Sequence, residues 1–253
     1  MPAAAAGLNA MAAARIAMWS GPRNVSTALL RSWGNRADTA VWDEPLYAHY
    51  LTQCTPDHPG IEEVVAAHET DWCKVVARML GPVPDDRPIY YQKHMAHHML
   101  PQIEDGWLAE LSNAFLIRDP AEVLLSMSKT MRVVTMQDTG IPDQFRLFER
   151  VRGLTGVVPP VIDAKDIGTD PEGTLRALCD ALAVPFDDAM LSWPPGPRQT
   201  DGVWGRHWYD RVNASTGFRP WQARNEPLPD RVRPLLDDCM EIYEEMQRDR
   251  LVP

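Results

Sequence analysis

The sequence predicts a three-layer α/β protein, with a mostly parallel central sheet and helices on both of its faces. Short apolar runs rich in β-branched and aromatic residues alternate along the chain with amphipathic stretches of helical periodicity. Parallel strands need crossover connections of this kind, so the alternation indicates βαβ units. The chain has 253 residues, a length that suits a domain with a sizeable core.

Five strands are expected. They cover residues 15–20, 39–43, 88–94, 113–119 and 158–164, where apolar, β-branched and aromatic residues cluster. Gly21-Pro22 ends the first strand, and Pro120 after the fourth strand suits the first position of a helix. The candidate functional residues are those that follow each strand, because open α/β sheets bind ligands beyond the carboxyl ends of their strands.

Amphipathic spacing predicts the helices between the strands. Val25, Leu29, Leu30 and Trp33 recur at helical spacing after the first strand, and one long helix is expected over residues 61–80. Two more helices are expected at about residues 171–183 and 230–247. Residues 193–221 hold Pro, Gly, Trp and Arg in irregular order, which predicts a long ordered loop of the kind kept mainly for function.

The first fourteen residues are nearly all Ala and other small residues. A secretory signal has a basic segment and a longer apolar core, and this stretch has neither. We therefore expect residues 1–14 to be a disordered extension and residues 15–253 to form a single domain.

Charge and composition exclude several classes of protein. The chain carries 25 Lys+Arg against 35 Asp+Glu, a formal net charge of −10, which argues against a broad nucleic-acid surface. Its apolar runs are far shorter than the ~20 residues of a membrane span. The 4 cysteines have no CxxC spacing, so we expect reduced thiols in a cytoplasmic protein.

The loop after the first strand is a candidate anion site. It reads Gly21-Pro22-Arg23-Asn24-Val25-Ser26-Thr27. Free N–H groups at the start of the following helix, two hydroxyl groups and the Arg23 cation all favour a bound anion. The alternative is that the hydroxyl side chains only cap the helix.

The same loop resembles a P-loop, and we expect a fold like that of the P-loop nucleotide hydrolases. The triphosphatase motif ends in Gly-Lys-Ser/Thr, whereas Ser26, Thr27 and Ala28 stand at those places here. The phosphate-bridging Lys and the magnesium-binding hydroxyl are both missing. Hydrolysis of Mg-ATP is therefore disfavoured.

A second phosphate site is expected after the fourth strand. Arg118 lies at the end of that strand, and Ser126 follows eight residues later within the helix that begins at Pro120. Together they are suited to grip a phosphate separate from the first loop. The alternative is that Arg118 forms an ion pair with Asp119 or Glu122.

In combination, these motifs resemble the sulfotransferases that use 3′-phosphoadenosine 5′-phosphosulfate (PAPS). The stretches that carry the resemblance, in order, are WSGPRNVSTALL, DEPLYAHYL, QKHMAHH, LIRDP, VIDAKDI with PEGTLRALCDALAVPF, and HWYDRVNASTGF. They are most similar to a subgroup of which some plant members are labelled branched-chain aminotransferase-like because of a neighbouring domain. The resemblance covers nearly the whole chain from Arg15 to about Phe218.

The resemblance implies roles for particular residues. Arg23, Asn24, Val25, Ser26 and Thr27 would hold the 5′-phosphosulfate. Arg118 and Ser126 would hold the 3′-phosphate. Well-studied cytosolic members also carry a late Arg-Lys-Gly-x-x-Gly segment, which is absent here. The cations that could replace it are Arg206, Arg211 and Arg219.

Two residues at strand ends are candidates for the base that removes the acceptor's proton. His94 ends the third strand, and the resemblance implies a catalytic His in a segment of Lys and His at this place. The match is imperfect, because the family has one residue between the Lys and the His, whereas Lys93 and His94 are adjacent. Glu44 follows the second strand, as it does in carbohydrate-type members. Arg23 would neutralise charge during transfer. Each candidate base has a structural alternative as an ordinary hydrogen-bonding residue.

Two further groups of residues leave alternatives open. His94, His97 and His98 would share one face of a helix, but no supporting metal-ligand pattern accompanies them, and PAPS chemistry needs no metal. We therefore expect no metal site. Aromatic residues of the late loop either wall an acceptor pocket or fix the loop to the core; they are Trp193, Trp204, Trp208, Tyr209, Phe218 and Trp221.

The predicted function is transfer of a sulfonate group from PAPS to a hydroxyl of a small molecule or carbohydrate. One alternative is a catalytically silent nucleotide-binding protein of the same fold. A less favoured alternative is a P-loop kinase-like phosphotransferase. The sequence does not identify the acceptor or the oligomeric state.

Overall fold

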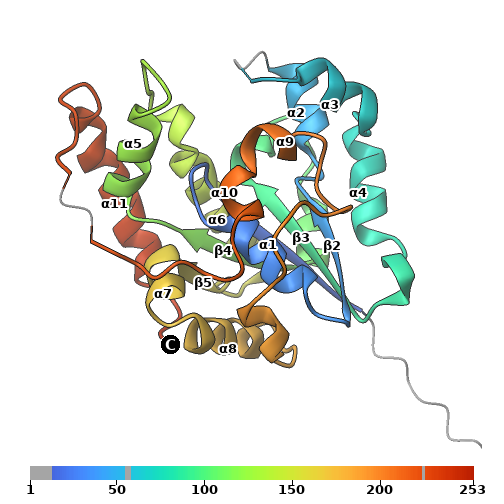
Figure 1. The fold of residues 1–253 in the computed structure, drawn as a ribbon. Helices are drawn as coiled ribbons and strands as arrows, with labels where there is room; N and C mark the ends of the chain where they lie inside the picture. The colour runs from blue at the N-terminus through green and yellow to red at the C-terminus, as the bar shows by residue number, and fades with distance from the viewer. Residues whose placement is uncertain (1–12, 55–57, 224–225) are drawn as a thin grey trace, which may run out of the picture.

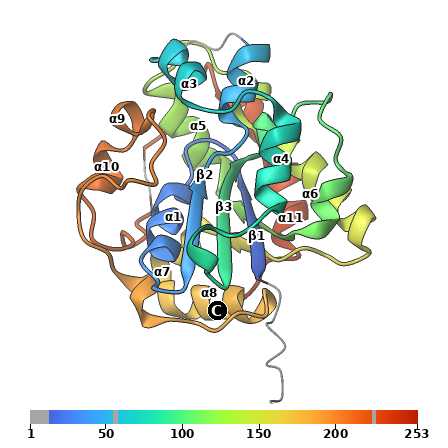
Figure 2. The same ribbon diagram turned by 90° about the vertical axis from the view of Figure 1, so that its right-hand side faces the viewer.

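The computed structural model describes residues 13–54, 58–223 and 226–253 of the chain. Its centre is a sheet of five parallel strands in the order β2-β3-β1-β4-β5, with helices packed on both faces (Figures 1 and 2). This architecture confirms the predicted three-layer α/β fold. The extension was predicted over residues 1–14, and residues 1–12 of it lie outside the described residues. Ala14 belongs to β1 rather than to the extension.

The five strands lie where the sequence predicts them, with small differences at their ends. They are β1 Ala14–Ser20, β2 Thr39–Asp43, β3 Ile89–Met95, β4 Ser112–Ile117 and β5 Val161–Asp163. The fifth is shorter than expected, because Pro159 and Pro160 carry no N–H to donate to a ladder. Its outer edge is partly covered by the C-terminal segment, where the Leu251 amide donates to the Val161 carbonyl at 2.8 Å.

Eleven α-helices are described in the parts of the chain that the structure covers. They are α1 Ser26–Gly34, α2 Tyr47–Gln53, α3 Ile61–Ala67, α4 Trp72–Leu80, α5 Pro120–Ser128, α6 Ile141–Thr155, α7 Ala164–Thr169, α8 Pro171–Ala181, α9 Gly205–Trp208, α10 Asp210–Asn213 and α11 Leu236–Gln247. Pro120 occupies the first turn of α5, as predicted, and the Asp119 side chain caps that helix.

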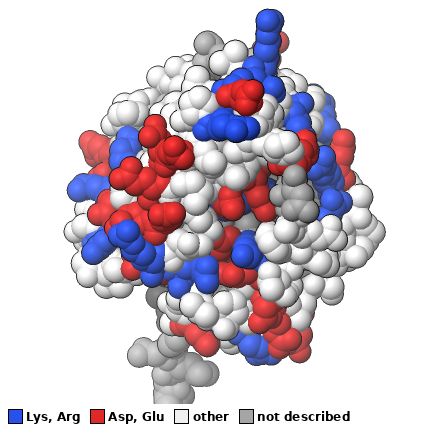
Figure 3. All heavy atoms as spheres, turned by 90° about the vertical axis from the view of Figure 1, so that its left-hand side faces the viewer, with Lys and Arg blue, Asp and Glu red and all other residues white. Residues whose placement is uncertain are grey.

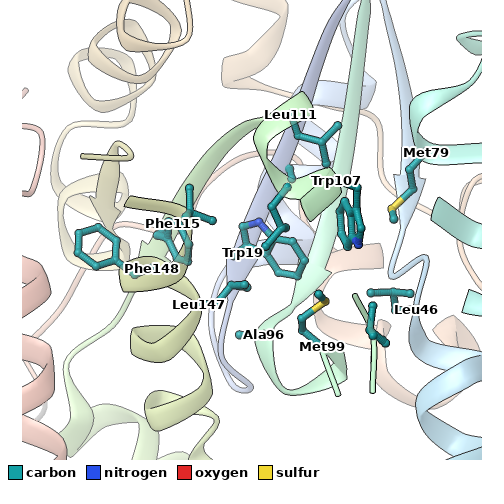
Figure 4. Close-up of a cluster of buried hydrophobic side chains, with 14 of the residues drawn as sticks. Trp19, Leu46, Met79, Ala96, Met99, Trp107, Leu111, Phe115, Leu147 and Phe148 are labelled. Carbon is teal, nitrogen blue, oxygen red and sulfur yellow. The ribbon is translucent and has the colours of Figure 1, made fainter. Parts of the chain in front are cut away.

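The alternation of side chains along β1 separates the core into two layers. Ala17 and Trp19 pack into a cluster with α4, α6 and α11, which Figure 4 shows around Trp19, Phe115 and Phe148. Ile16 and Met18 point to the other face and pack against α1, α7 and α8. Both faces of the sheet are therefore buried, as expected for parallel strands joined by helical crossovers.

The predicted helix over residues 61–80 is wrong as a single helix. It is broken into α3 and α4, because polar side chains in between compete for the backbone amides. Glu69 accepts from the amides of Thr70 and Asp71, and Asp71 accepts from the amide of Cys73 to cap α4. The amphipathic pattern continues across this break and does not reveal it.

Two other boundaries differ from prediction. Helix α11 begins at Leu236 after a 3₁₀ turn, Arg233–Leu235, rather than at residue 230, since Pro234 has no N–H for a helical bond. The predicted long loop over residues 193–221 includes α9 and α10. These two short helices follow one another at Gly205–Trp208 and Asp210–Asn213 and carry part of the site.

The strand order sets the position of the site. The chain leaves β1 toward β2 on one side, and β4 lies on the other side of β1. Ligands of open α/β sheets bind at such a switch point, beyond the carboxyl ends of the strands. The loop after β1 therefore lies at the expected place.

The surface has mixed charge. Over the face shown in Figure 3, Lys and Arg are interspersed with Asp and Glu. In the ranges that the structure describes, no helix is both long and apolar enough to cross a membrane.

Candidate functional site

A cavity of about 1770 Å³ opens at the carboxyl ends of the strands. Ligand pockets commonly measure roughly 300–1,000 Å³, so this one is large. Its walls come from the loop after β1, the ends of β2 and β3, helix α5, and the late segment around α9 and α10. The polar and charged residues that line it include Arg23, Asn24, Ser26, Thr27, Glu44, Lys93, Arg118, Ser126, Tyr209, Arg211 and Arg219, and Val25 lines it as well.

The loop after β1 is held in a particular shape by its own side chains. Asn24 donates to the Leu116 carbonyl at 2.9 Å, and its other side-chain atom accepts from the Val25 amide at 2.8 Å. Arg23 has a φ of 59°, in the left-handed region that non-glycine residues rarely adopt. Asn24 thus links the loop to β4. Backbone conformations like that of Arg23 are concentrated at functional sites.

The two predicted phosphate sites are adjacent rather than separate. The Arg23 Nε atom donates to the Ser126 hydroxyl at 3.0 Å, and one Arg118 nitrogen donates to the Arg23 carbonyl at 2.5 Å. The structure therefore brings together the loop, the end of β4 and helix α5. The alternative reading of Arg118 also holds, since its Nε and second terminal nitrogen bond to Glu122 at 3.0 and 2.6 Å.

Positive charge is concentrated at this cradle of Arg23, Arg118 and Ser126. Burial, and then repulsion from Arg211 and Arg118, lowers the pKa of Arg23 below its ordinary value. Arg211 and Arg118 thus repel Arg23 inside the cavity, and an anion bound at the cradle would relieve that repulsion.

Two of the three arginines considered as replacements for the absent late segment line the cavity. Arg211 of α10 and Arg219 line the cavity. Arg206 pairs with Glu63 and lies outside the lining residues. Of these three arginines, Arg211 and Arg219 thus reach the cavity and Arg206 does not.

A second polar group lies at the ends of β2 and β3. The Lys93 ammonium contacts Glu44 Oε1 at 2.5 Å and Asp43 Oδ1 at 2.9 Å. Burial raises the pKa of Glu44 above its ordinary value, although the Lys93 charge opposes that rise. Burial also opposes the charge on Lys93, but the carboxylates of Asp43 and Glu44 raise its pKa well above the usual range.

Glu44 is held in an unusual backbone conformation. Its φ is 42°, and its amide donates to the Lys93 carbonyl at 2.9 Å, which continues the β2–β3 ladder one residue past β2. This bend turns the side chain into the cavity, where 12% of it is exposed. Glu44 is therefore an accessible carboxylate beside a fixed ammonium group.

His94 is placed differently from Glu44. It is 1% exposed, stacks on Trp19 with ring centroids 4.2 Å apart, and is not among the residues that line the cavity. Burial, with a smaller effect of Lys93, lowers the pKa of His94 to about 3. Neighbouring residues on a strand face opposite sides, so Lys93 reaches the cavity and His94 points into the core.

His97 and His98 follow β3 in a short 3₁₀ turn and line the cavity. His98 stacks on Tyr47 and Tyr50, and its Nδ1 atom lies 3.9 Å from Glu44 Oε2. Within the described ranges, no group of three or more His, Cys, Asp or Glu side chains is arranged to hold a metal ion.

Some aromatic residues of the late segment anchor it to the core, and others line the cavity. Trp193 is buried against Phe218, with ring centroids 5.0 Å apart, and anchors the segment. Trp208 and Trp221 are exposed and line the cavity. Trp204 is buried but also lines the cavity and packs edge-on against Tyr47.

Two site residues were given no role by the sequence analysis. Asp43 appeared there only as the last residue of a strand, and Tyr209 only as one of several aromatic residues. The Tyr209 hydroxyl donates to Asp43 Oδ2 at 2.6 Å and lies 3.2 Å from the Lys93 ammonium. The sequence separation of 166 residues between Tyr209 and Asp43 explains why no local motif signals the contact.

Comparison with known proteins identifies the family of the chain. Residues 14–250 match the family described as Sulfotransferase domain, so the chain belongs to the sulfotransferase family. The similarity extends to a relative from Arabidopsis thaliana named branched-chain-amino-acid aminotransferase-like protein 2. That relative is 34% identical over 225 residues, covering 89% of this chain and 40% of the relative. The chain thus spans about 40% of the length of this relative.

Solved structures share the fold. The sulfotransferase domain of the curacin biosynthetic pathway is 17% identical with a TM-score of 0.51, covering 90% of this chain and 98% of that domain. The sulfotransferase domain of the Synechococcus PCC 7002 olefin synthase is 16% identical with a TM-score of 0.53, covering 96% of each chain. These likenesses confirm the fold class at low sequence identity.

Proposed function

We propose that the protein transfers the sulfonate group of PAPS to a hydroxyl of a small molecule or carbohydrate. The observation that carries this proposal is the joint placement, in one cavity, of a cationic cradle and an accessible carboxylate. The cradle is Arg23, Arg118 and Ser126, and the carboxylate is Glu44 beside Lys93. The cradle suits the binding and neutralisation of an anionic group, and the carboxylate suits removal of a proton from a hydroxyl.

The residues of the cradle fit the donor's charges. Arg23 and the loop over Asn24 to Thr27 would hold the 5′-phosphosulfate, and Arg118 with Ser126 would hold the 3′-phosphate. Arg211 and Arg219 add positive charge to the same cavity. When bound, PAPS supplies an activated sulfonate group with a phosphate as the leaving group.

We assign the base to Glu44 rather than to His94. Glu44 reaches the cavity, and a carboxylate with a raised pKa is a better base than an ordinary one. His94 lies in the core, and its low pKa makes it a weak base. Lys93 would stabilise the negative charge that develops on the oxygen between phosphorus and sulfur.

A binding experiment tests the donor assignment. Isothermal titration calorimetry with adenosine 3′,5′-bisphosphate in EDTA should give a dissociation constant in the micromolar range or below. Binding only with ATP and magnesium would contradict the proposal and favour the kinase-like alternative.

A transfer experiment then tests catalysis. The protein is incubated with ³⁵S-labelled PAPS and a panel of phenols, alcohols and sugars, and labelled products are separated by chromatography. Labelled product with at least one acceptor supports the proposal. Tight bisphosphate binding without transfer to any acceptor would instead favour the catalytically silent alternative.

We also propose that the protein works in a reducing compartment such as the cytoplasm. Cys54, Cys73, Cys179 and Cys239 are all unpaired in the structure. Free thiols persist where disulfides are kept reduced.

A further inference from the structure

The Lys93 ammonium lies between two carboxylates of different accessibility. Asp43 is 2% exposed as a residue, and its side chain is completely buried. The Glu44 side chain is 12% exposed and reaches the cavity. One ammonium and two carboxylates leave this cluster with one excess negative charge when both acids are ionised.

The register of the sheet fixes Asp43 beside Lys93. The two residues are partners in the parallel β2–β3 ladder, so their side chains leave the sheet on the same face. The resulting ion pair, at 2.9 Å, depends on the backbone ladder and not on a mobile loop. Glu44 comes after the end of β2 and lacks this constraint.

Tyr209 fixes the second oxygen of Asp43. Its hydroxyl donates to Asp43 Oδ2 at 2.6 Å and accepts from the Trp204 indole at 3.1 Å. Burial, followed by the charge of Asp43, raises the pKa of Tyr209 well above its ordinary value. The hydroxyl therefore stays protonated and serves as a permanent donor to Asp43.

The charge balance of proton removal gives these contacts a role. When Glu44 takes a proton from the acceptor hydroxyl, it becomes neutral and no longer holds Lys93 by charge. A buried ammonium without a counter-ion would tend to lose its proton or leave its place. With Asp43 at 2.9 Å, Lys93 keeps a counter-ion through the whole step.

We propose that Asp43, oriented by Tyr209, is the permanent counter-ion of Lys93, and that this arrangement leaves Glu44 free to accept the acceptor's proton. This inference rests on the proposed function, because it assigns positioning residues to that reaction. In the step itself, the acceptor O–H bond breaks with its proton passing to Glu44. The acceptor oxygen bonds to sulfur, and the bond from sulfur to the bridging oxygen breaks with its electron pair going to the departing bisphosphate.

Other titratable groups surround this cluster on the elements packed against it. They are Tyr47 of α2, His68 after α3, Tyr91 and His94 of β3, and His98 after β3. Burial lowers the pKa values of the three histidines and raises those of the two tyrosines, so these groups are neutral near pH 7. Asp43 and Glu44 are thus the anions that determine the state of Lys93.

Lysine NMR tests the counter-ion role without any need for catalysis. The chain has only four lysines, and Lys74, Lys129 and Lys165 are exposed, so ε-¹³C-labelled lysine gives a simple spectrum in which Lys93 is assigned by Lys93→Gln. In Asp43→Asn we expect Lys93 to titrate roughly 1–3 pH units below its wild-type midpoint. An unchanged midpoint in a folded Asp43→Asn protein would overturn the proposal.

Turnover tests the positioning role of Tyr209. Tyr209→Phe keeps the ring and removes the hydroxyl, and we expect kcat to fall about tenfold with the KM for PAPS and the affinity for adenosine 3′,5′-bisphosphate unchanged. In Asp43→Asn the acidic limb of the kcat profile should also move to lower pH, because Asp43 raises the pKa of Glu44. A loss of bisphosphate affinity equal to the loss of kcat would indicate a merely structural role and refute the assignment.

Tyr91→Phe is the matched control. Tyr91 is fully buried on the same strand as Lys93, and its hydroxyl has no hydrogen-bond partner in the described residues. This variant should keep wild-type kcat. If the wild-type protein transfers sulfonate to no acceptor, the proposed function fails, while the Lys93 titration still decides the counter-ion role by itself.

Discussion

Removal of the Arg118 guanidinium tests the assignment of the 3′-phosphate most directly. Arg118→Met keeps the aliphatic stem and deletes the charged fork at the end of β4. A hydrogen bond to a charged group contributes about 1.5–3 kcal/mol, so its loss weakens bisphosphate binding roughly 10- to 150-fold. The variant also leaves Glu122, now bonded to Arg118 at 2.6 and 3.0 Å, as an uncompensated negative charge near the phosphate.

The assay compares two ligands by calorimetry in EDTA. Adenosine 3′,5′-bisphosphate should lose at least about tenfold in affinity, whereas adenosine 5′-phosphate, which has no 3′-phosphate, should lose less than about threefold. The double variant Arg118→Met/Glu122→Gln separates the lost bonds from the repulsion by Glu122. Arg150→Met is the matched control, because Arg150 forms an exposed ion pair with Asp105 outside the cavity.

One result would refute the reasoning. Arg118 also donates to the Arg23 carbonyl and so helps to hold the loop after β1. If this were its main role, both ligands would weaken by the same factor. Equal losses would therefore sink the 3′-phosphate assignment and leave Arg118 as a support of the loop.

Three further predictions concern catalysis and stability. Glu44→Gln should lower kcat by about 10²–10⁴-fold with unchanged bisphosphate affinity, whereas His94→Gln should keep most of the wild-type kcat. If the ³⁵S transfer assay gave the reverse ranking, the base would be His94. Burial lowers the pKa of His94 to about 3 and of His97 to about 4, so the unfolded chain binds these protons first as pH falls below about 6.5. The free energy of unfolding should therefore fall from pH 7 to pH 5, by up to about 1.4 kcal/mol per pH unit for each histidine. Urea titrations that gave the same free energy of unfolding at every pH would contradict the lowered pKa values of His94 and His97. Trp33→Ala should cost about 3–5 kcal/mol in urea unfolding, because Trp33 is fully buried and stacks on Tyr91, whereas the exposed Trp208→Ala should cost far less; similar costs for the two would argue against the described core.

Much of the fold could be predicted because local sequence carries it. Buried strands of a parallel sheet appear as short apolar runs, and all five were found in that way. Helix α6, Ile141–Thr155, was not predicted, although Pro142 in its first turn and the apolar spacing of Leu147, Phe148 and Val151 were available as signals. The break between α3 and α4 was not predicted, because hydrophobic periodicity gives no sign of the side chains of Glu69 and Asp71 that compete for backbone amides.

The site could be predicted only in part, and the limit lies in contacts between distant segments. The loop after β1 and the pair Arg118 and Ser126 follow from local motifs, and the structure brings them together. The proposed preference for Glu44 over His94 rests on which side chain reaches the cavity. That depends on the direction in which each side chain leaves the sheet, which a sequence motif does not reveal. The pairing of Tyr209 with Asp43 joins segments far apart in sequence, and a single sequence carries no record of it.

Under the proposed function, the left-handed backbone of Arg23 and Glu44 sets stability against activity at these two positions. Each residue adopts a conformation that costs a side-chain-bearing residue of order 1–3 kcal/mol and that glycine adopts freely. Glycine there would relax the backbone but delete the cation of the cradle or the proposed base. Selection for thermal tolerance alone would therefore favour glycine at both positions, at the expense of the proposed reaction. A library screened for stability should keep both codons fixed.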